Sequence, residues 1–311
     1  RRRIRTERPN PSHRKAPMAP PSPEPARGGK SAPLAALRRE AADLLQGLRE
    51  AGVWLARRPL HLWLQLAVLA LLFAGWSWLG NTLPRGFFAT PSETLQALGT
   101  LLHDHRQDYL RALGATLKIY FGGLALAAVT GIPLGLALGA APLLGRTMNP
   151  YLNALAATPL IALMPLIILW FGLGDAAKVL IVALGAVIPI LINSYTGLRG
   201  ASPALREMAR AFGMSRVARL RHVLLPSAFH PVMAGLRLGA VSGLVTAVIA
   251  DIYMAMTGLG ALLITYGNSF RMGPYLVTVL TLALIGTATT ALISLIERLL
   301  TPPPSRKRLF H

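Results

Sequence analysis

The sequence predicts an all-α, polytopic membrane protein with six transmembrane helices. Of its 311 residues, 53% are hydrophobic and only 14% are charged, whereas soluble domains carry about 25% charged residues. The apolar residues gather in uncharged runs that match the roughly 20 helical residues needed to cross a bilayer core. Because these runs do not alternate with period two, they indicate helices rather than a β-barrel. The runs fall at 59–80, 119–145, 147–174, 179–198, 228–250 and 272–296, and Arg237 alone interrupts the run 228–250.

Two segments precede the first run. Residues 1–32 are rich in arginine and proline and contain no apolar stretch of the signal-peptide type, so we expect a disordered basic tail. Residues 33–58 predict an amphipathic juxtamembrane helix that lies on the membrane surface or packs on a partner. Its apolar stripe is Leu34, Leu37, Ala41, Leu44, Leu45 and Leu48.

The distribution of positive charge predicts the orientation of the spans. Arginine and lysine are concentrated before residue 59, between 199 and 226, and in the tail 301–311. With six spans these three regions fall on one side, and the positive-inside rule makes that side the cytoplasm. Both termini are therefore expected to be cytoplasmic, and residues 81–113 to form an extracytoplasmic segment. A net charge of +20 distributed in this way favours a bilayer over nucleic acid as the partner.

Glycine and proline occur repeatedly within the runs. Glycines recur at every fourth position in the second and fifth runs, which makes a smooth helix face on which another backbone can pack closely; direct contact with a substrate is the alternative. The glycines are Gly131, Gly135, Gly139, Gly235, Gly239 and Gly243. Among the prolines within the runs, Pro133, Pro159, Pro165 and Pro189 are expected to interrupt helical hydrogen bonding and favour kinks.

Three ionisable residues are candidates for a substrate path, because charges at membrane depth are costly. Arg237 interrupts the fifth run and would either reach back to the cytoplasmic surface or attract an anion. Asp251 and Lys118 lie at run ends, where a position at the membrane interface is the alternative. The runs contain no arrangement typical of a catalytic or metal site, and we expect no cofactor bound by this chain. The stretch "GGKS" at 28–31 lacks the first glycine of a phosphate-binding loop, since Glu24 stands there.

The basic stretch 200–226 predicts two short amphipathic helices joined at a glycine. Ser202 and Pro203 are typical of a helix start, and Gly213 of a helix end. Ser215 would cap the second helix, which we expect to end at Pro226. Such a knob fits docking against a partner, although a loop lying on anionic lipid would also explain the arginines.

The spacing within this stretch resembles the EAA loop in permease subunits of bacterial ABC importers. In that loop E-A-A is followed by three residues, G, nine residues, I, one residue, and L-P. Here Glu207, Met208 and Ala209 occupy the first positions, Gly213 the glycine, Val223 the isoleucine, and Leu225 and Pro226 the end. Met208 and Val223 depart from the pattern conservatively. The likeness covers about residues 80–300 and is greatest for the nitrate/sulfonate/taurine branch, in which a glutamate often stands at the position of Asp251.

The resemblance implies the transmembrane domain of a type I ABC importer, over residues 114–300, in the bacterial inner membrane. It further implies a non-enzymatic transport subunit whose loop 200–226 couples it to a separate ATPase. The expected partners are two ATPase subunits, a second permease copy and an extracytoplasmic solute-binding protein, with ATP bound by the ATPase. Nitrate, an aliphatic sulfonate or taurine are the expected solutes, and pyrimidine-like thiamine precursors remain open. An ion-coupled secondary transporter and a membrane scaffold or signalling subunit are the alternatives.

Overall fold

A computed structural model describes residues 60–84, 86–254 and 257–301 of the chain. The predicted tail 1–32, the amphipathic helix 33–58 and residues 302–311 lie outside them. The chain divides into two compact units after Leu69, and the described part of the first unit is the first half of α2. The described residues form helices and turns without strands, which confirms the all-α class.

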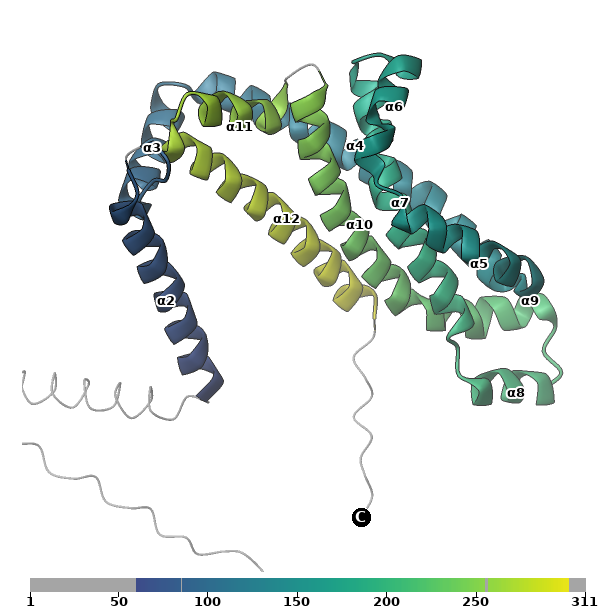
Figure 1. Ribbon diagram of the computed structural model, residues 1–311. Coiled ribbons are helices and arrows are strands. Elements are labelled where there is room, and N and C mark those ends of the chain that lie inside the picture. The colour runs from purple at the N-terminus through teal and green to yellow at the C-terminus, as the bar shows by residue number, and fades with distance from the viewer. Residues whose placement is uncertain (1–59, 85, 255–256, 302–311) are drawn as a thin grey trace, which may run out of the picture. The chain divides into compact units, whose positions relative to one another are not determined.

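The order of the helices follows the predicted runs closely (Figure 1). They are α2 (Leu60–Thr82), α3 (Pro91–His103), α4 (Arg106–Ala140), α5 (Pro142–Ala157), the 3₁₀ turn η1 (Leu160–Leu163), α6 (Met164–Phe171), α7 (Asp175–Arg199), α8 (Pro203–Ala211), α9 (Arg216–Arg219), the π-helical turn η2 (Leu220–Leu224), α10 (Leu225–Tyr253), α11 (Gly258–Asn268) and α12 (Met272–Leu300).

Five helical segments of the described residues are long and apolar enough to cross a membrane. They lie in α2, α4, α7, the continuous stretch from α9 to α10, and α12. The run at 147–174, expected as a single span, is instead broken: α5 and the η1–α6 segment meet at an angle of 83°. If this bent pair is one span, the total is the predicted six.

The break in the third run lies at Pro159. Thr158, the residue before it, leaves the helical conformation with a ψ of 125°, as the ring of a following proline favours. The other prolines behave differently. Pro133 and Pro189 lie inside the continuous helices α4 and α7, and Pro165 lies in the first turn of α6, where no helical N–H is needed. Of these four prolines, only Pro159 lies at a helix break.

Helix α7 is the centre of the second unit, and it packs against α4 and α10 through small residues. A Cβ atom added at Gly135 of α4 would lie 2.5 Å from the carbonyl oxygen of Leu191, and one at Gly239 of α10 would lie 2.7 Å from Cγ1 of Ile190. Such distances show that the helix backbones approach closely. Among the six glycines of the two rows, Gly243 leaves room for an ordinary contact, at 3.4 Å from the Cβ of Ala186.

Other glycines extend this packing beyond the two rows noted in the sequence. A Cβ at Gly123 of α4 would lie 2.5 Å from Cβ of Val182, and one at Gly185 of α7 would lie 2.6 Å from Cγ2 of Thr246. The core around them is apolar and includes Tyr120, whose hydroxyl donates to the carbonyl of Ala240 at 3.1 Å. The three-helix core α4–α7–α10 thus provides a rigid base for the elements at its two ends.

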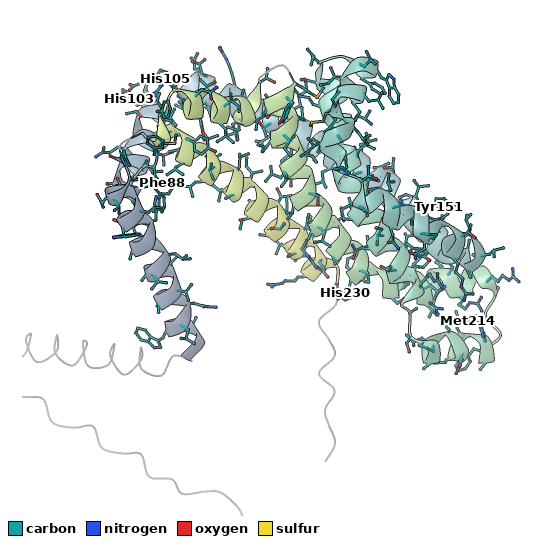
Figure 2. All side chains as sticks on the ribbon, viewed as in Figure 1. Phe88, His103, His105, Tyr151, Met214 and His230 are labelled. Atoms are coloured by element: carbon teal, nitrogen blue, oxygen red, sulfur yellow. The ribbon has the colours of Figure 1, made fainter. Side chains whose placement is uncertain are left out.

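The segment 81–113 contributes α3 and the first turns of α4 at one end of this core. Helix α3 begins with a capping box, in which Glu93 N–H donates to Thr90 Oγ1 at 3.2 Å and Thr90 N–H donates to Glu93 Oε2 at 2.9 Å. Leu101 of α3 and Tyr109 of α4 join an apolar cluster with α11 and α12. Figure 2 labels His103 and His105 at this end and Met214, in the basic stretch, at the other.

Candidate functional site

The basic stretch forms a helix that projects from the end of α7. Helix α8 begins at Pro203 and ends at Ala211, in agreement with the predicted start and glycine stop. Ser202 precedes it, although its side chain makes no capping hydrogen bond. In Figure 1, α8 lies beyond the ends of α7 and α10.

A Schellman turn ends α8 and sets the direction of the chain after it. The N–H of Met214 donates to the carbonyl of Ala209 at 3.0 Å, and the N–H of Gly213 donates to the carbonyl of Arg210 at 2.9 Å. Gly213 has a φ of +67°, in the left-handed region that glycine adopts at least cost. No heavy atom lies within 4 Å of the position that a Cβ would take there. The glycine is therefore required by backbone conformation and not by crowding.

The second helix differs from the prediction at its end. Ser215 does cap it, since Ser215 Oγ accepts from the N–H of Ala218 at 3.2 Å. However, the helix does not stop at Pro226: it continues through η2 into α10. The N–H of Leu225 donates to the carbonyl of Leu220, five residues earlier. This wider turn, a π-bulge, lies directly before a proline that has no N–H to donate, and bulges of this kind are frequent at functional sites.

The outer side of α8 presents side chains without partners. Leu205, Met208 and Phe212 are 41%, 49% and 79% exposed, whereas Ala209 is buried. Glu207 is exposed and makes no hydrogen bond or ion pair with any residue of the described ranges. An exposed apolar ridge beside an unpaired carboxylate is the surface expected of a docking helix.

The remaining residues of the loop lie where α10 begins. Val223 is half-buried, and Leu225 and Pro226 are exposed. Arg206 anchors the inner side of α8, because its Nη2 donates to the carbonyl of Leu198 at 3.3 Å and to the carbonyl of Arg199. Movement of α8 is thereby linked to the last turn of α7.

A second cluster lies at the opposite end of the core and is centred on Asp251. Its Oδ1 accepts from Nζ of Lys178 at 3.0 Å, and its Oδ2 accepts from Oγ1 of Thr116 at 2.6 Å. Lys178 Nζ also donates to Oγ1 of Thr257 at 2.6 Å. The Lys178 and Asp251 side chains are both almost fully buried. The ion pair joins α7 to α10, and the hydrogen bonds of Thr116 and Thr257 connect it to α4 and to the turn before α11.

The start of α11 packs directly on this ion pair. The N–H of Leu259 donates to Thr116 Oγ1 at 2.8 Å. Gly258 has a φ of +81°, and a Cβ there would lie 2.1 Å from Oδ2 of Asp251. A Cβ at Gly260 would lie 2.7 Å from Cβ of Asp251. The glycines at the start of α11 therefore make room for the buried carboxylate.

Of the three predicted ionisable residues, Asp251 alone belongs to this cluster. Lys118 forms an exposed ion pair with Asp175 at 2.8 Å. Arg237 pairs with Glu297 of α12, which also binds His230 at 2.8 Å. Arg237 lies fourteen residues before Asp251, or about 21 Å along α10. The structure thus does not bring the three together at one site.

The sequence did not single out Lys178, because the stretch "GLGDAAK" has the appearance of a charge-neutral loop between two apolar runs. A usable signal was present, since Lys178 lies on the helix face of Ile181, Val182 and Gly185, all of which are buried. A lysine on such a face requires an acidic partner. The search for that partner would have led to Asp251.

The chain resembles known transport proteins over most of the described region. Residues 131–302 match the family described as binding-protein-dependent transport system inner membrane component. The taurine transport system permease protein TauC of Escherichia coli is 28% identical over 247 residues, covering 77% of this chain and 89% of TauC.

Two further relatives match a shorter region. The permease protein SsuC of Escherichia coli, named for transport of aliphatic sulfonates, is 34% identical over 154 residues. The riboflavin transport system permease protein RibX of Chloroflexus aurantiacus is 39% identical over 157 residues. Each match covers 50% of this chain and spans 59% of the relative's length.

The fold is that of a solved ABC transporter subunit. A chain from the inward-facing MetNI methionine ABC transporter superposes with a TM-score of 0.57 at 20% identity. The superposition covers 64% of this chain and 99% of the MetNI chain.

Proposed function

Because this chain belongs to the family of inner-membrane components of binding-protein-dependent transport systems, we propose that it is the permease subunit of an ATP-driven importer that couples to its ATPase through α8. The observation that carries this proposal is the exposed ridge of α8 with unpaired Glu207, ended by the left-handed Gly213. These residues occupy the spacing of the EAA loop. A surface of this kind on a membrane protein fits a soluble partner with a complementary groove.

The proposed assembly contains two copies of this chain, two ATPase subunits and an extracytoplasmic solute-binding protein. ATP binds to the ATPase subunits, and their closure moves the two α8 helices. Because Arg206 joins α8 to the carbonyls of Leu198 and Arg199, that motion passes into α7. Helix α7 is packed tightly between α4 and α10, so these three helices are expected to move as one body and to open the path alternately to each side.

The proposed solute is a small sulfonate such as taurine. TauC, which carries taurine in its name, matches across 89% of its own length. RibX is more identical over a shorter region and is named for riboflavin, so percentage identity alone does not sort the solutes. In a binding-protein-dependent system the first selection falls on the binding protein, and the solute is therefore best tested on that partner.

Uptake into proteoliposomes tests the function directly. The complete complex, assembled with the ATPase and binding protein that co-purify with this chain, is expected to accumulate labelled taurine when ATP and the ATPase are on the inner side of the vesicle. Nitrate, ethanesulfonate and riboflavin serve as competitors. Thermal unfolding of the binding protein in each solute measures which one it binds.

Three outcomes distinguish the alternatives. Uptake driven by an ion gradient without the ATPase would establish a secondary transporter and overturn the proposal. Formation of a complex that hydrolyses ATP but accumulates none of these solutes would leave the coupling intact and overturn the sulfonate assignment. A complex with neither activity would favour a scaffold.

Cysteine labelling tests the proposed cytoplasmic position of α8 and the proposed extracytoplasmic position of α3. The sequence contains no cysteine, so a single introduced thiol is the sole target for a membrane-impermeant maleimide. Spheroplasts enclose the cytoplasmic face of the membrane. Arg210→Cys on α8 is therefore expected to react only after the spheroplasts are permeabilised. Gln96→Cys on α3, also exposed, is the matched control and should react in intact spheroplasts. The opposite labelling pattern would show that α8 lies outside the cytoplasm and that the proposed topology is wrong.

A further inference from the structure

A hollow of about 450 Å³ lies between α5 and the last turn of α7. It is on the same end of the core as α8, because α7 leads into α8 after Gly200. Its lining is Arg146, Asn149, Tyr195, Thr196, Arg199 and Gly200. This hollow is separate from the exposed ridge of α8 and from the Lys178–Asp251 cluster.

The hollow is positively charged. Two guanidinium groups, of Arg146 and Arg199, line it, and no carboxylate does. Arg146 is exposed and makes no ion pair or hydrogen bond within the described ranges. The side-chain amide of Asn149 likewise has no partner there. Both groups are therefore free to bind a ligand.

Arg199 is held in place by buried groups. Its Nη1 donates to the hydroxyl of Tyr195 at 2.5 Å, and its guanidinium carbon lies 5.4 Å from the centre of the Tyr195 ring. The same hydroxyl donates to the carbonyl of Gly145 at 2.9 Å, and Tyr195 is only 4% exposed. This chain of hydrogen bonds connects α7 to the first turn of α5. Arg199 is thus preorganised, which lowers the entropy cost of binding.

The carbonyl end of α7 would ordinarily repel an anion, because the helix dipole is negative there. Arg206 offsets this effect, since it donates to the carbonyls of Leu198 and Arg199 from the α8 side. Three arginines therefore surround the last turn of α7. Two of them face the hollow, and the third neutralises the helix end behind it.

We propose that this hollow binds a phosphate-type oxyanion, supplied by a phospholipid headgroup or by free phosphate. Guanidinium groups bind phosphate oxygens in pairs of charge-assisted hydrogen bonds, and Asn149 can donate a further one. Leu143, which lies one turn before Arg146 on α5, is 82% exposed. This exposure favours a lipid source, because an acyl chain can lie along its apolar side chain.

A ligand at this position has a mechanical consequence for α8. Arg199 contributes its guanidinium to the hollow and its carbonyl to the anchor of α8 through Arg206. A bound oxyanion would therefore stabilise the last turn of α7 and the position of α8. This binding site goes beyond the proposed import function and does not depend on the identity of the solute.

Thermal unfolding of the detergent-purified full-length protein tests the proposal with three defined probes: dihexanoyl phosphatidylglycerol, dihexanoyl phosphatidylcholine and inorganic phosphate. Phosphatidylglycerol is expected to raise the unfolding temperature with saturation, and phosphatidylcholine to have little effect. The double variant Arg146→Gln/Arg199→Gln should weaken apparent affinity at least about tenfold, as expected when charge-assisted hydrogen bonds are removed. The control Arg298→Gln removes an exposed charge of α12 outside the hollow and should retain the response.

A second variant covers the case in which the double arginine variant does not fold. Asn149→Asp is nearly isosteric and places a carboxylate in the hollow, so it should also weaken binding at least about tenfold. A response to inorganic phosphate that matches the response to phosphatidylglycerol assigns the site to free phosphate, whereas a response to phosphatidylglycerol alone assigns it to lipid. The proposal is overturned if neither anion stabilises the wild-type protein, or if Asn149→Asp binds as tightly as wild type.

Discussion

Replacement of Glu207 by alanine is expected to abolish solute-stimulated ATP hydrolysis and uptake while leaving the permease folded. Glu207 is exposed and has no partner within the described ranges, so its loss removes no contact from the folded chain. If the carboxylate is a hydrogen-bonded group buried at the ATPase interface, its truncation costs about 2–5 kcal/mol of docking energy, or about thirtyfold or more in affinity.

The measurement is solute-stimulated ATPase activity of the reconstituted complex, with the unfolding temperature of the isolated permease as the folding control. Arg298→Gln, an exposed change on α12 at the same end of the core, is expected to leave both values unchanged. Normal stimulated hydrolysis with Glu207→Ala would show that this carboxylate does not dock. A lowered unfolding temperature would assign it a structural role instead.

Gly213 offers a matched pair of substitutions at a single position. A β-branched residue there must adopt the left-handed conformation, which costs about 1–2 kcal/mol, although its side chain would meet open space. Asparagine tolerates that conformation. Gly213→Val is therefore expected to lower solute-stimulated ATP hydrolysis, and Glu207→Ala serves as the benchmark for that loss. Gly213→Asn is expected to retain most of the activity. Equal loss from both substitutions would mean that the ATPase requires a bare backbone at this turn.

The sequence was sufficient to predict the spans whose boundaries are set by composition. The apolar parts of α2, α7 and α12 coincide closely with uncharged runs, because a bilayer core excludes charge from most of the length of a helix; Lys178, at the start of α7, lies outside its run. The turn at Gly213 and the cap at Ser215 were also predictable, since both depend on local backbone chemistry. Local signals of this kind do not require knowledge of neighbouring helices.

Breaks and pairings within the membrane were not predictable in the same way. Pro159 ends a helix, whereas Pro133 and Pro189 do not, because neighbouring helices decide whether a proline is accommodated. The second helix of the loop continues past Pro226 because η2 changes the hydrogen-bonding pattern before it, which spacing alone does not reveal. Composition thus determines where helices lie, and packing determines where they bend.

Lys178→Met is expected to destabilise the protein by about 3–5 kcal/mol, because it leaves the Asp251 carboxylate buried without its cationic partner. Thr116 would still donate to Asp251 Oδ2, but one hydroxyl does not offset a buried charge. The start of α11 should loosen first, since Leu259 and Gly258 pack on this carboxylate. Thermal unfolding in one detergent measures the loss.

Two matched variants separate pairing from general damage. Lys118→Met breaks a similar lysine–aspartate pair that is exposed, and it should change the unfolding temperature much less, because exposed pairs contribute little. The double variant Lys178→Met/Asp251→Asn removes both charges and keeps an acceptor for Thr116, so it should recover a large part of the loss. The single variant Asp251→Asn completes the comparison. If the double variant loses as much stability as Lys178→Met and Asp251→Asn together, the two residues act independently, and the geometry of the pair has no energetic consequence. Recovery would instead show that the instability of Lys178→Met comes from an unpaired buried charge at the start of α11. An uncharged pair of similar shape avoids that charge and therefore restores stability.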